Sequence, residues 1–342
     1  MRAIVIHAAR DLRVEEREAD PVGPGQVAVR IEAGGICGSD LHYYNHGGFG
    51  VVRLREPMIL GHEIAGVVTA LGDGVAGLSI GDRVAVNPSR PCRHCRFCLR
   101  GLPNQCLHMR FYGSAMPMPH IQGGFRESLV CDAVQCVKAE RATTSELALA
   151  EPLAVALHAV SRAGPITGRR VLVTGCGPIG ALAAVAARHA GAAEVVVTDI
   201  VDEPLAIARR LGADRAVNTA ATPDALAPDA AEKGRFGVMI ECSGNERALR
   251  AGLDVLEPRG TLVQLGLGGE VALPQNLVVA KELAIVGSFR FHDEFALAVA
   301  LIDERRVDLA PMLTGRFDAD DAVAAFELAS DRRRAMKVQI AF

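Results

Sequence analysis

The sequence predicts an α/β protein with two domains, one a β-rich, partly open barrel and the other a doubly wound parallel sheet. Its 342 residues exceed one ordinary domain, because single cores stop growing at roughly 250–300 residues. Residues 1–150 alternate short β-like runs with glycines, whereas a repeated pattern of strand, turn and helix starts near residue 168. We therefore expect a β-rich domain at 1–150, completed by 289–342, and a parallel-sheet domain at 151–288.

The strands expected in the β-rich domain are short apolar runs that end at turn residues. They are 26–31, 64–70 and 83–86. The segment 338–342 is expected to be a last strand that rejoins this domain.

The second domain is expected to begin with the buried strand 171–174, VLVT, followed by a glycine turn and an Ala-rich helix from about Pro178. The order continues with strands at 194–199, 238–242 and 261–266 and with helices between them. Strands that alternate with helices pair in parallel, so the pattern indicates a doubly wound sheet.

Composition and charge argue against several classes of function. Half of the residues are apolar and 23% are charged, which is typical of a globular chain. The 40 acidic and 37 basic residues give a net charge of −3 without a basic stripe, so we expect neither nucleic acid nor membrane as a partner. No run reaches the roughly 18 apolar residues of a membrane span, and the early charges in MRAIVIHAARDLRV are not typical of a secretory signal. We expect a cytoplasmic protein.

A glycine-rich turn, GCGPIG, follows the strand 171–174 and begins the next helix. Glycines at this place let the backbone approach a pyrophosphate, which the helix N-terminus stabilises. Asp199 ends the following strand, where a carboxylate accepts hydrogen bonds from adenosine ribose hydroxyls, and no arginine precedes Arg209 to bind a 2′-phosphate. The sequence thus favours NAD over NADP; the alternative is that the glycines only form a tight turn and Asp199 only caps a helix. The expected cofactor contacts are Gly175, Gly177, Pro178, Ile179, Gly180, Asp199 and Ile200.

Four of the nine cysteines lie in one short segment with the spacing C-x2-C-x2-C-x7-C. An odd total and this crowding favour metal ligation over disulfides. Four thiolates close a tetrahedral zinc site without an open position, so this ion would be structural. An iron–sulfur cluster is the alternative, since four cysteines also hold clusters. The ligands are Cys92, Cys95, Cys98 and Cys106.

A second set of metal-binding residue types is dispersed: Cys37 in GGICGSD, His62 and Glu63 in GHE, and Glu151 in AEPLA. One thiolate, one imidazole and one carboxylate suit a catalytic zinc that keeps a position for water or substrate. Each residue alone is more typical of a buried core cysteine or a hydrogen-bonded histidine. The sequence does not rank Glu63 against Glu151 as the ligand.

Together these motifs resemble the zinc-dependent medium-chain alcohol and polyol dehydrogenases. GGICGSDLH, GHEIAGVV, GDRVAV, the four-cysteine segment, EPLAVALHA and GCGPIG occur in the family's order along the whole chain. The resemblance implies a GroES-like catalytic domain, a Rossmann domain that binds NAD, two zinc ions per chain, and a homodimer or homotetramer. Simple alcohol dehydrogenases of the family have a cysteine at the position of Glu151, whereas sorbitol-type members have a glutamate. The resemblance therefore implies a sugar-like substrate. HYYNHG, NPSRPCRHC, NQCLHMRFYGSAMPMPHIQGGF and GSFRF are similar to members that act on a sugar acid.

The resemblance also implies roles for polar residues near the catalytic metal. The Ser39 hydroxyl, together with His42, would begin a proton relay, although His42 is equally typical of a surface histidine. A sugar-acid carboxylate needs a cation, for which Arg110, Arg290 and His292 are candidates; an arginine paired with a surface acid is the common alternative. The remaining residues expected to line the substrate pocket are Tyr43, Phe111 and Ser114.

Three other functions stay open. The chain could be a sorbitol, xylitol or threonine dehydrogenase of the same family. A zinc-free quinone reductase of related fold would lack the set Cys37, His62 and Glu151. A non-catalytic zinc module would bind a partner or nucleic acid through the four-cysteine segment, but the charge balance and the complete nucleotide turn argue against it.

Overall fold

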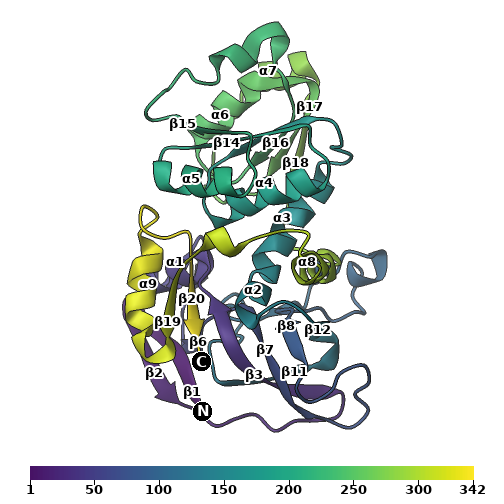
Figure 1. The fold of residues 1–342 in the computed structure, drawn as a ribbon, viewed down its shortest axis with the longest axis vertical. Coiled ribbons are helices and arrows are strands. Elements are labelled where there is room, and N and C mark those ends of the chain that lie inside the picture. The colour runs from purple at the N-terminus through teal and green to yellow at the C-terminus, as the bar shows by residue number, and fades with distance from the viewer. The chain divides into compact units, whose positions relative to one another are not determined.

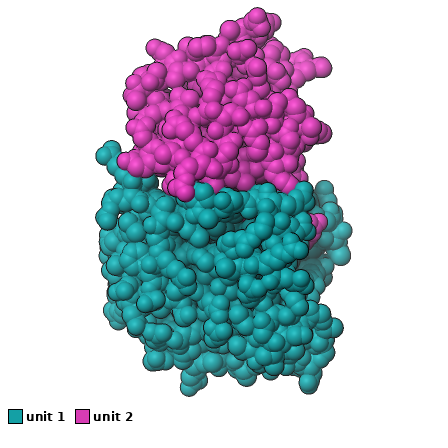
Figure 2. All heavy atoms as spheres, in the orientation of Figure 1, with its two compact units in different colours: residues 1–151, 295–342 teal, residues 152–294 magenta.

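The computed structural model describes all 342 residues, which form two compact units. Unit 1 comprises residues 1–151 and 295–342, and unit 2 comprises residues 152–294, as coloured in Figure 2. Each unit has a hydrophobic core of its own. None of the helices combines the length and the apolar character that a membrane span requires.

A seven-stranded, mostly antiparallel sheet is the main sheet of unit 1 (Figure 1). The C-terminal strand β20 (Lys337–Ala341) is antiparallel to β3 (Gln26–Gly35), which places the end of the chain in the sheet of its beginning. β3 also pairs with β11 (Ser128–Asp132). From edge to edge the strands are β12 (Cys136–Ala139), β8 (Arg83–Val86), β7 (Glu63–Leu71), β3, β20 and β19 (Leu313–Asp318).

Smaller sheets and short helices complete unit 1. A three-stranded sheet has the order β2 (Asp11–Glu16), β1 (Arg2–Ala8) and β6 (Met58–Ile59). The two-stranded pairs are β4 (Gly48–Phe49) with β5 (Val52–Arg53), and β9 (Ser89–Arg90) with β10 (Arg110–Phe111). The helices are α1 (Gly38–His46), α2 (Thr144–Leu147) and α9 (Ala322–Ser330), while α3 (Ala150–Arg162) and α8 (Glu294–Asp303) cross the boundaries between the units.

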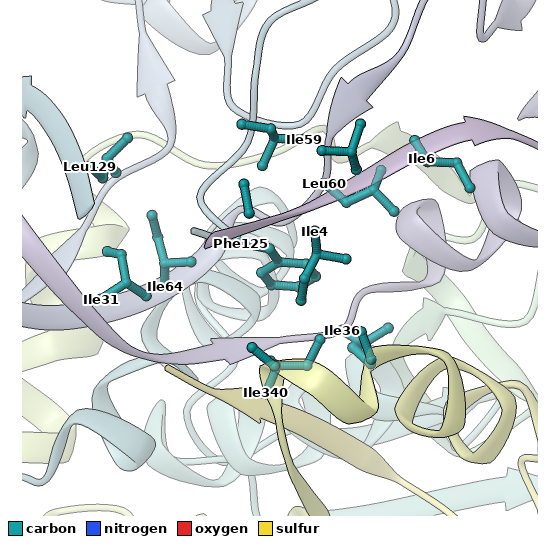
Figure 3. Packing of buried hydrophobic residues seen from close by; sticks show 14 of the residues in the cluster. Ile4, Ile6, Ile31, Ile36, Ile59, Leu60, Ile64, Phe125, Leu129 and Ile340 are labelled. Atoms are coloured by element: carbon teal, nitrogen blue, oxygen red, sulfur yellow. The ribbon is translucent and has the colours of Figure 1, made fainter. Parts of the chain in front are cut away.

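The core of unit 1 packs around Phe125, which is fully buried; Figure 3 shows the isoleucine and leucine side chains gathered about it. The residue before His62 must be glycine for this packing. Gly61 has φ 92°, and a Cβ atom there would lie 2.1 Å from Cδ1 of Phe125. The core therefore fixes the backbone on which His62 stands.

Unit 2 is a six-stranded sheet in which all strands are parallel, which confirms the doubly wound sheet predicted from the sequence. The strand order is β15 (Arg215–Asn218), β14 (Glu194–Asp199), β13 (Arg170–Thr174), β16 (Phe236–Glu241), β17 (Leu256–Gln264) and β18 (Ala284–Gly287). This strand order is typical of dinucleotide-binding sheets, in which the direction of chain progression reverses between the two central strands, here β13 and β16. The helices are α4 (Pro178–His189), α5 (Asp202–Arg210), α6 (Glu246–Val255) and α7 (Gln275–Lys281).

The expected strand bounds hold for β13 and β14 within one residue, because their valine and leucine runs are buried as parallel strands require. β17 instead begins at Leu256, five positions before the expected 261. The residues LEPRG before position 261 include a proline and a glycine, which favour a turn. The chain stays extended there, with a register irregularity against β16 between Phe236 and Val238.

Candidate active site and metal centres

Cys37, His62 and Glu63 lie together in unit 1. One ligand atom of each lies within 4.8 Å of those of the other two. The sheet explains this meeting, since Cys37 follows the end of β3 and Glu63 begins β7, its antiparallel neighbour. His62 and Glu63 are buried, and Cys37 is partly exposed. The structure thus joins two short motifs that are far apart in the sequence.

Close packing holds Glu63 in this group. Gly35 pairs with Glu63 across the two strands. A Cβ atom at Gly35 would come within 2.2 Å of Oε2 of Glu63. The glycine in GGIC therefore makes room for the carboxylate.

Lys337 forms a buried ion pair with Glu63. Its Nζ lies 2.8 Å from both Glu63 carboxylate oxygens and also donates to the Ile36 carbonyl at 3.1 Å. The two side chains are only 2% and 1% exposed. Burial disfavours the charged lysine, but Glu63 and Cys37 outweigh it and raise the pKa of Lys337. The lysine thus fixes the position of Glu63.

Asp40 connects the two segments that carry the ligands. It lies in the first turn of α1, fully buried, and accepts hydrogen bonds from the Cys37 N–H at 3.0 Å and the Gly61 N–H at 3.2 Å. Its Oδ1 is 3.8 Å from Nδ1 of His62. Burial raises the pKa of Asp40, although His62 and the backbone N–H groups oppose the rise.

The group carries more acids than bases. Burial raises the pKa of Cys37 to about 12, and Glu63 adds to the rise. Glu151 is buried in the first turn of α3, outside the group of three. Burial raises its pKa to about 8; His62 opposes this, and Glu63 and Cys37 add to it. These mutual effects indicate a cluster of acidic groups that a divalent cation would stabilise.

The donor set fits a zinc ion. A thiolate, an imidazole and a carboxylate are three protein donors, the number typical of catalytic zinc sites. Nδ1 of His62 is buried without a hydrogen-bond partner. Because Asp40 faces that nitrogen, we infer that the other ring nitrogen binds the metal, as metal-bound histidines commonly donate their second N–H to a carboxylate. Of the two glutamates that the sequence left unranked, the structure places Glu63 with Cys37 and His62.

The four cysteines of the second cluster also lie within 4.8 Å of one another, in the loop that contains two short 3-10 helices, η1 (Cys98–Arg100) and η2 (Pro103–Gln105). Backbone N–H groups point at the sulfurs: Cys95 N is 3.3 Å from Sγ of Cys92, and Cys92 N is 3.2 Å from Sγ of Cys106. Similar bonds hold the pKa of Cys95 at about 6. These contacts favour a thiolate at Cys95 and fit a metal, whereas burial and the neighbouring Cys95 and Cys106 raise the pKa of Cys98 to about 12.

The sulfur spacing favours a single ion over an iron–sulfur cluster. Zinc–sulfur bonds of about 2.3 Å place tetrahedral sulfurs roughly 3.8 Å apart. All four sulfurs lie within 4.8 Å of one another, and Sγ of Cys95 and Sγ of Cys98 are 3.6 Å apart. Several irons between the cysteines would need more room than this.

The glycine turn of unit 2 lies between β13 and α4. Gly175 has φ 84°, and a Cβ atom at Gly180 would lie 1.8 Å from the Gly175 carbonyl oxygen. Gly177 is the N-cap residue and Pro178 the first residue of α4, so N–H groups at this helix end can bind an anion. Ile179 is partly exposed beside them.

Asp199, at the end of β14, contacts this turn directly. Its Oδ2 accepts from Cys176 N at 2.7 Å, and its Oδ1 accepts from Ile200 N at 2.7 Å and Val201 N at 3.0 Å. A carboxylate at the end of this strand is the group that accepts hydrogen bonds from ribose hydroxyls in dinucleotide-binding sheets. The Ile200 side chain is exposed.

Ser39, His42 and Phe111 lie near the metal ligands or on the same helix. Ser39 is partly exposed and His42 exposed on α1. Their spacing of three residues puts both on one face of the helix. The ring centroid of Phe111 is 5.4 Å from that of His62. Phe111 is thus the expected pocket residue that lies directly beside a ligand.

Tyr43 and Ser114 make contacts within unit 1. The Tyr43 hydroxyl accepts from Ala115 N at 3.0 Å, and the side chain belongs to the buried core. The Ser114 hydroxyl accepts from Met116 N at 3.3 Å. As placed, both stabilise the segment around residue 115.

The three candidate cations for a substrate carboxylate have different surroundings. Arg110 is exposed in β10 of unit 1. Arg290, in unit 2, has φ 56° and places its guanidinium 4.9 Å from the ring centroid of Phe289. His292 lies 3.2 Å from the carboxylate of Asp293. None of these contacts singles out one cation for a substrate.

Asp40 and Lys337 are functional candidates that the sequence analysis missed. Asp40 had a weak signal, since an acid three residues after Cys37 is typical of a helix start. Lys337 had none beyond being a cation next to the apolar run of the last strand.

The chain matches two family models. Residues 23–141 match the alcohol dehydrogenase GroES-like domain, and residues 178–304 match the zinc-binding dehydrogenase model. The two models fall in the regions of the β-rich sheet and of the parallel sheet.

Similar proteins match this chain over nearly its full length. L-idonate 5-dehydrogenase (NAD(P)(+)) of Escherichia coli K12 is 40% identical and covers 100% of this chain and 98% of its own. Its crystal structure has a TM-score of 0.96 with the same identity and coverage. Sorbitol dehydrogenase of Gallus gallus is 38% identical, covering 95% of this chain and 92% of its own.

Proposed function

The chain belongs to the zinc-dependent medium-chain alcohol dehydrogenase family, and from this premise we propose that it oxidises a secondary alcohol of a sugar acid, with L-idonate as substrate and 5-keto-D-gluconate as product. The reaction rests on one observation, the convergence of Cys37, His62 and Glu63 within 4.8 Å. The choice of substrate rests on the 40% identity to the Escherichia coli enzyme over the whole chain.

The reaction balances with one cofactor. The alcohol carbon gives a hydride to NAD⁺ and the alcohol oxygen gives up a proton, which yields a ketone, NADH and H⁺. When bound, zinc lowers the pKa of a hydroxyl by several units, and NAD accepts the hydride. The protein supplies binding, orientation and a route for the proton.

Cys37, His62 and Glu63 would hold the catalytic zinc. Lys337 keeps the Glu63 carboxylate in place through its two 2.8 Å contacts. Asp40 orients His62 from 3.8 Å. Glu151, buried near the same group, is the second candidate ligand.

Ser39 and His42 would carry the proton to water. Ser39 is two residues from Cys37, and His42 follows on the same face of α1 and is exposed. Partial burial of the ring and the neighbouring His46 lower the pKa of His42, which favours the neutral ring that can accept a proton.

The glycine turn and Asp199 would bind NAD in preference to NADP. A 2′-phosphate would meet the Asp199 carboxylate, which repels it. Arg209 could compensate, but its guanidinium donates to the Ala216 carbonyl at 2.6 Å. The four-cysteine cluster would hold a second zinc ion that stabilises its loop and takes no part in the chemistry.

We also propose that the chain forms a homo-oligomer through unit 2. β18 is an edge strand. Leu267 and Val279 are 86% and 76% exposed, and Ile285 of β18 is 41% exposed. An edge strand and exposed apolar side chains are typical of surfaces that associate. Location in the cytoplasm stays a prediction.

A sorbitol-type polyol dehydrogenase is the second candidate function, because sorbitol dehydrogenase of Gallus gallus is 38% identical. The difference between 40% and 38% identity does not separate an acid from a polyol. The two substrates differ in one respect that a site must recognise, the negative charge of the carboxylate.

Initial rates of NADH formation test the proposal. Zinc-loaded protein is given L-idonate, gluconate, sorbitol, xylitol or threonine, each with NAD⁺ or NADP⁺. We expect the highest kcat/KM with L-idonate and NAD⁺, and about two zinc ions per chain by metal analysis. A rate with sorbitol far above that with L-idonate would reject the substrate, and no turnover of any alcohol by zinc-loaded protein would reject the reaction.

A further inference from the structure

Three polar residues stand side by side at the ends of adjacent strands of unit 2. Thr174 ends β13, Glu241 ends β16 and Gln264 ends β17. The strand register pairs Thr174 with Glu241 and Glu241 with Gln264. β13 and β16 are neighbours at the point where the strand order reverses. Doubly wound sheets bind dinucleotides at this point, outside the carboxyl ends of the strands.

Glu241 is fully buried and is held by hydrogen-bond donors instead of an ion pair. Its charge is stabilised by hydrogen-bond donors alone, which a buried carboxylate requires. The donors are Ser243 N at 2.8 Å, Gly244 N at 2.9 Å, Gln264 Nε2 at 2.8 Å, Thr174 Oγ1 at 3.3 Å and the Ser243 hydroxyl. One carboxylate thus joins three strand ends to the turn that follows β16.

The turn held by Glu241 packs against the glycine turn expected to bind the pyrophosphate. A Cβ atom at Gly175 would lie 2.8 Å from Cα of Ser243. On its other side, a Cβ atom at Gly268 would lie 1.6 Å from the Gly244 carbonyl oxygen. The backbones therefore touch, and a shift of residues 243–244 would move both neighbouring loops.

The loop after β17 is tied to the same residue. Leu265 N and Gly266 N donate to the Glu241 carbonyl at 2.9 and 2.8 Å. Gln264 Nε2 bonds both the Glu241 carboxylate and the Gly266 carbonyl, at 2.8 and 2.9 Å. Main chain and side chain of Glu241 together fix residues 264–266.

We propose that Glu241 is a positioning residue for the nicotinamide half of NAD. Asp199 lies on the β14 side of the glycine turn and is placed for the adenosine ribose. The β16 and β17 loops lie on the other side of the strand-order reversal, which leaves them for the nicotinamide half. Glu241 holds these loops at a fixed distance from the glycine turn. This inference rests on the proposed function, because it requires that the chain binds NAD.

The test compares two ligands on the Glu241→Gln variant of the full, zinc-loaded chain. The amide keeps the shape but turns a donor toward the N–H groups of Ser243 and Gly244. We expect the Kd for NADH, measured by fluorescence titration, to rise about tenfold. The Kd for AMP, which occupies only the adenine half, stays within about twofold of the wild-type value.

Asp229→Asn is the matched control. Asp229 is a buried carboxylate of the same unit, bonded to both guanidinium nitrogens of Arg215 at 3.0 Å. Arg215 begins the edge strand β15, which β14 and β13 separate from β16. We expect lower thermal stability and an unchanged Kd for NADH.

A milder variant covers the case in which Glu241→Gln does not fold. Ser243→Ala removes one donor to the same carboxylate and is expected to raise the Kd for NADH about two- to fivefold. An unchanged Kd for NADH, or an equal loss of AMP and NADH binding, would overturn the positioning role. Wild-type protein that binds AMP but not NADH would overturn the proposed function. Failure of the positioning role is therefore seen in the variants, and failure of the proposed function is seen in the wild-type protein.

Discussion

The two cysteine-containing clusters of unit 1 are assembled in opposite ways. The four-cysteine cluster comes from one loop, Cys92 to Cys106, and two of its members are partly exposed. The group of Cys37, His62 and Glu63 comes from the ends of two paired strands, with Lys337 and Asp40 buried against it. Four like donors fill every position of a tetrahedral ion, whereas three mixed donors do not.

This difference indicates how each cluster relates to stability and to chemistry. A loop that folds around an ion gains its order from the ion. A group placed by a core of strands keeps its order through packing, so its ion can serve the reaction. The variants below change one cluster at a time, beginning with the largest expected effect.

Cys37→Ser should abolish most activity and leave the fold intact. The loss of one ligand removes several kcal/mol of stabilisation in the reaction, so kcat/KM should fall about a thousandfold. Zinc content should fall by about one ion per chain, with little change in Tm. Rates and metal analysis check this; a variant that keeps a tenth of the activity would contradict the assignment of Cys37.

Cys95→Ser should lower the stability of the protein and leave most of its activity. One zinc ion per chain should again be lost, but here Tm should fall by at least about 5 °C. The kcat/KM of the folded protein should stay within about threefold. Cys136→Ser is the control, because Cys136 is partly exposed and belongs to neither cluster. It should leave the zinc content unchanged. If Cys95→Ser loses activity in proportion to the zinc that it loses, the four-cysteine cluster takes part in the reaction and is not only a stabilising site.

Asp40→Asn should weaken the first cluster without removing a ligand. Loss of the carboxylate that faces His62 should reduce zinc affinity or kcat/KM about 10- to 100-fold. Titration with a competing chelator measures the affinity. Asp303→Asn is the control. The Asp303 carboxylate accepts hydrogen bonds from the backbone N–H groups of residues 140–142 and contacts neither cluster. Equal effects of the two variants on zinc affinity would reject the role of Asp40.

The pair of His158 and Glu294 lies outside both clusters, and its removal has the smallest expected effect. It also predicts how the stability of the protein depends on pH. Nδ1 of His158 lies 2.9 Å from the Glu294 carboxylate. Burial would raise the pKa of Glu294, but hydrogen bonds from His158 and from His292 N lower it to about 2, below its usual 4.5. The folded state binds this proton more weakly than the unfolded state, so the stabilisation is complete above about pH 4.5 and lost as the pH falls toward 2.

Glu294→Gln should therefore reduce the free energy of unfolding by about 1–2 kcal/mol near neutral pH. The difference from wild type should shrink between about pH 4.5 and 2. Urea unfolding of both proteins at several pH values measures it. Because acid releases metal from both proteins alike, the difference isolates Glu294; a difference that grows in acid would contradict the sign.

Features set by neighbours in the sequence could be predicted before the structure. The strands 171–174 and 194–199 and the glycine turn depend on local apolar runs and on glycine conformations, and they lie within one residue of expectation. The start of β17 could not be predicted in this way, because Pro258 and Gly260 favour a turn while pairing with β16 keeps the chain extended. Strand pairing is non-local and overrides such preferences.

The sequence by itself determined which residue types could bind metal, that four cysteines could close around one ion, and that a glycine turn meets a helix start. Spacing along one loop or one turn is enough for these features. Only the tertiary structure placed Glu63 rather than Glu151 beside Cys37 and His62, and only it brought Lys337 and Asp40 to them. The reason is physical: these contacts follow from the register of β3, β7 and β20, which no spacing within one segment encodes.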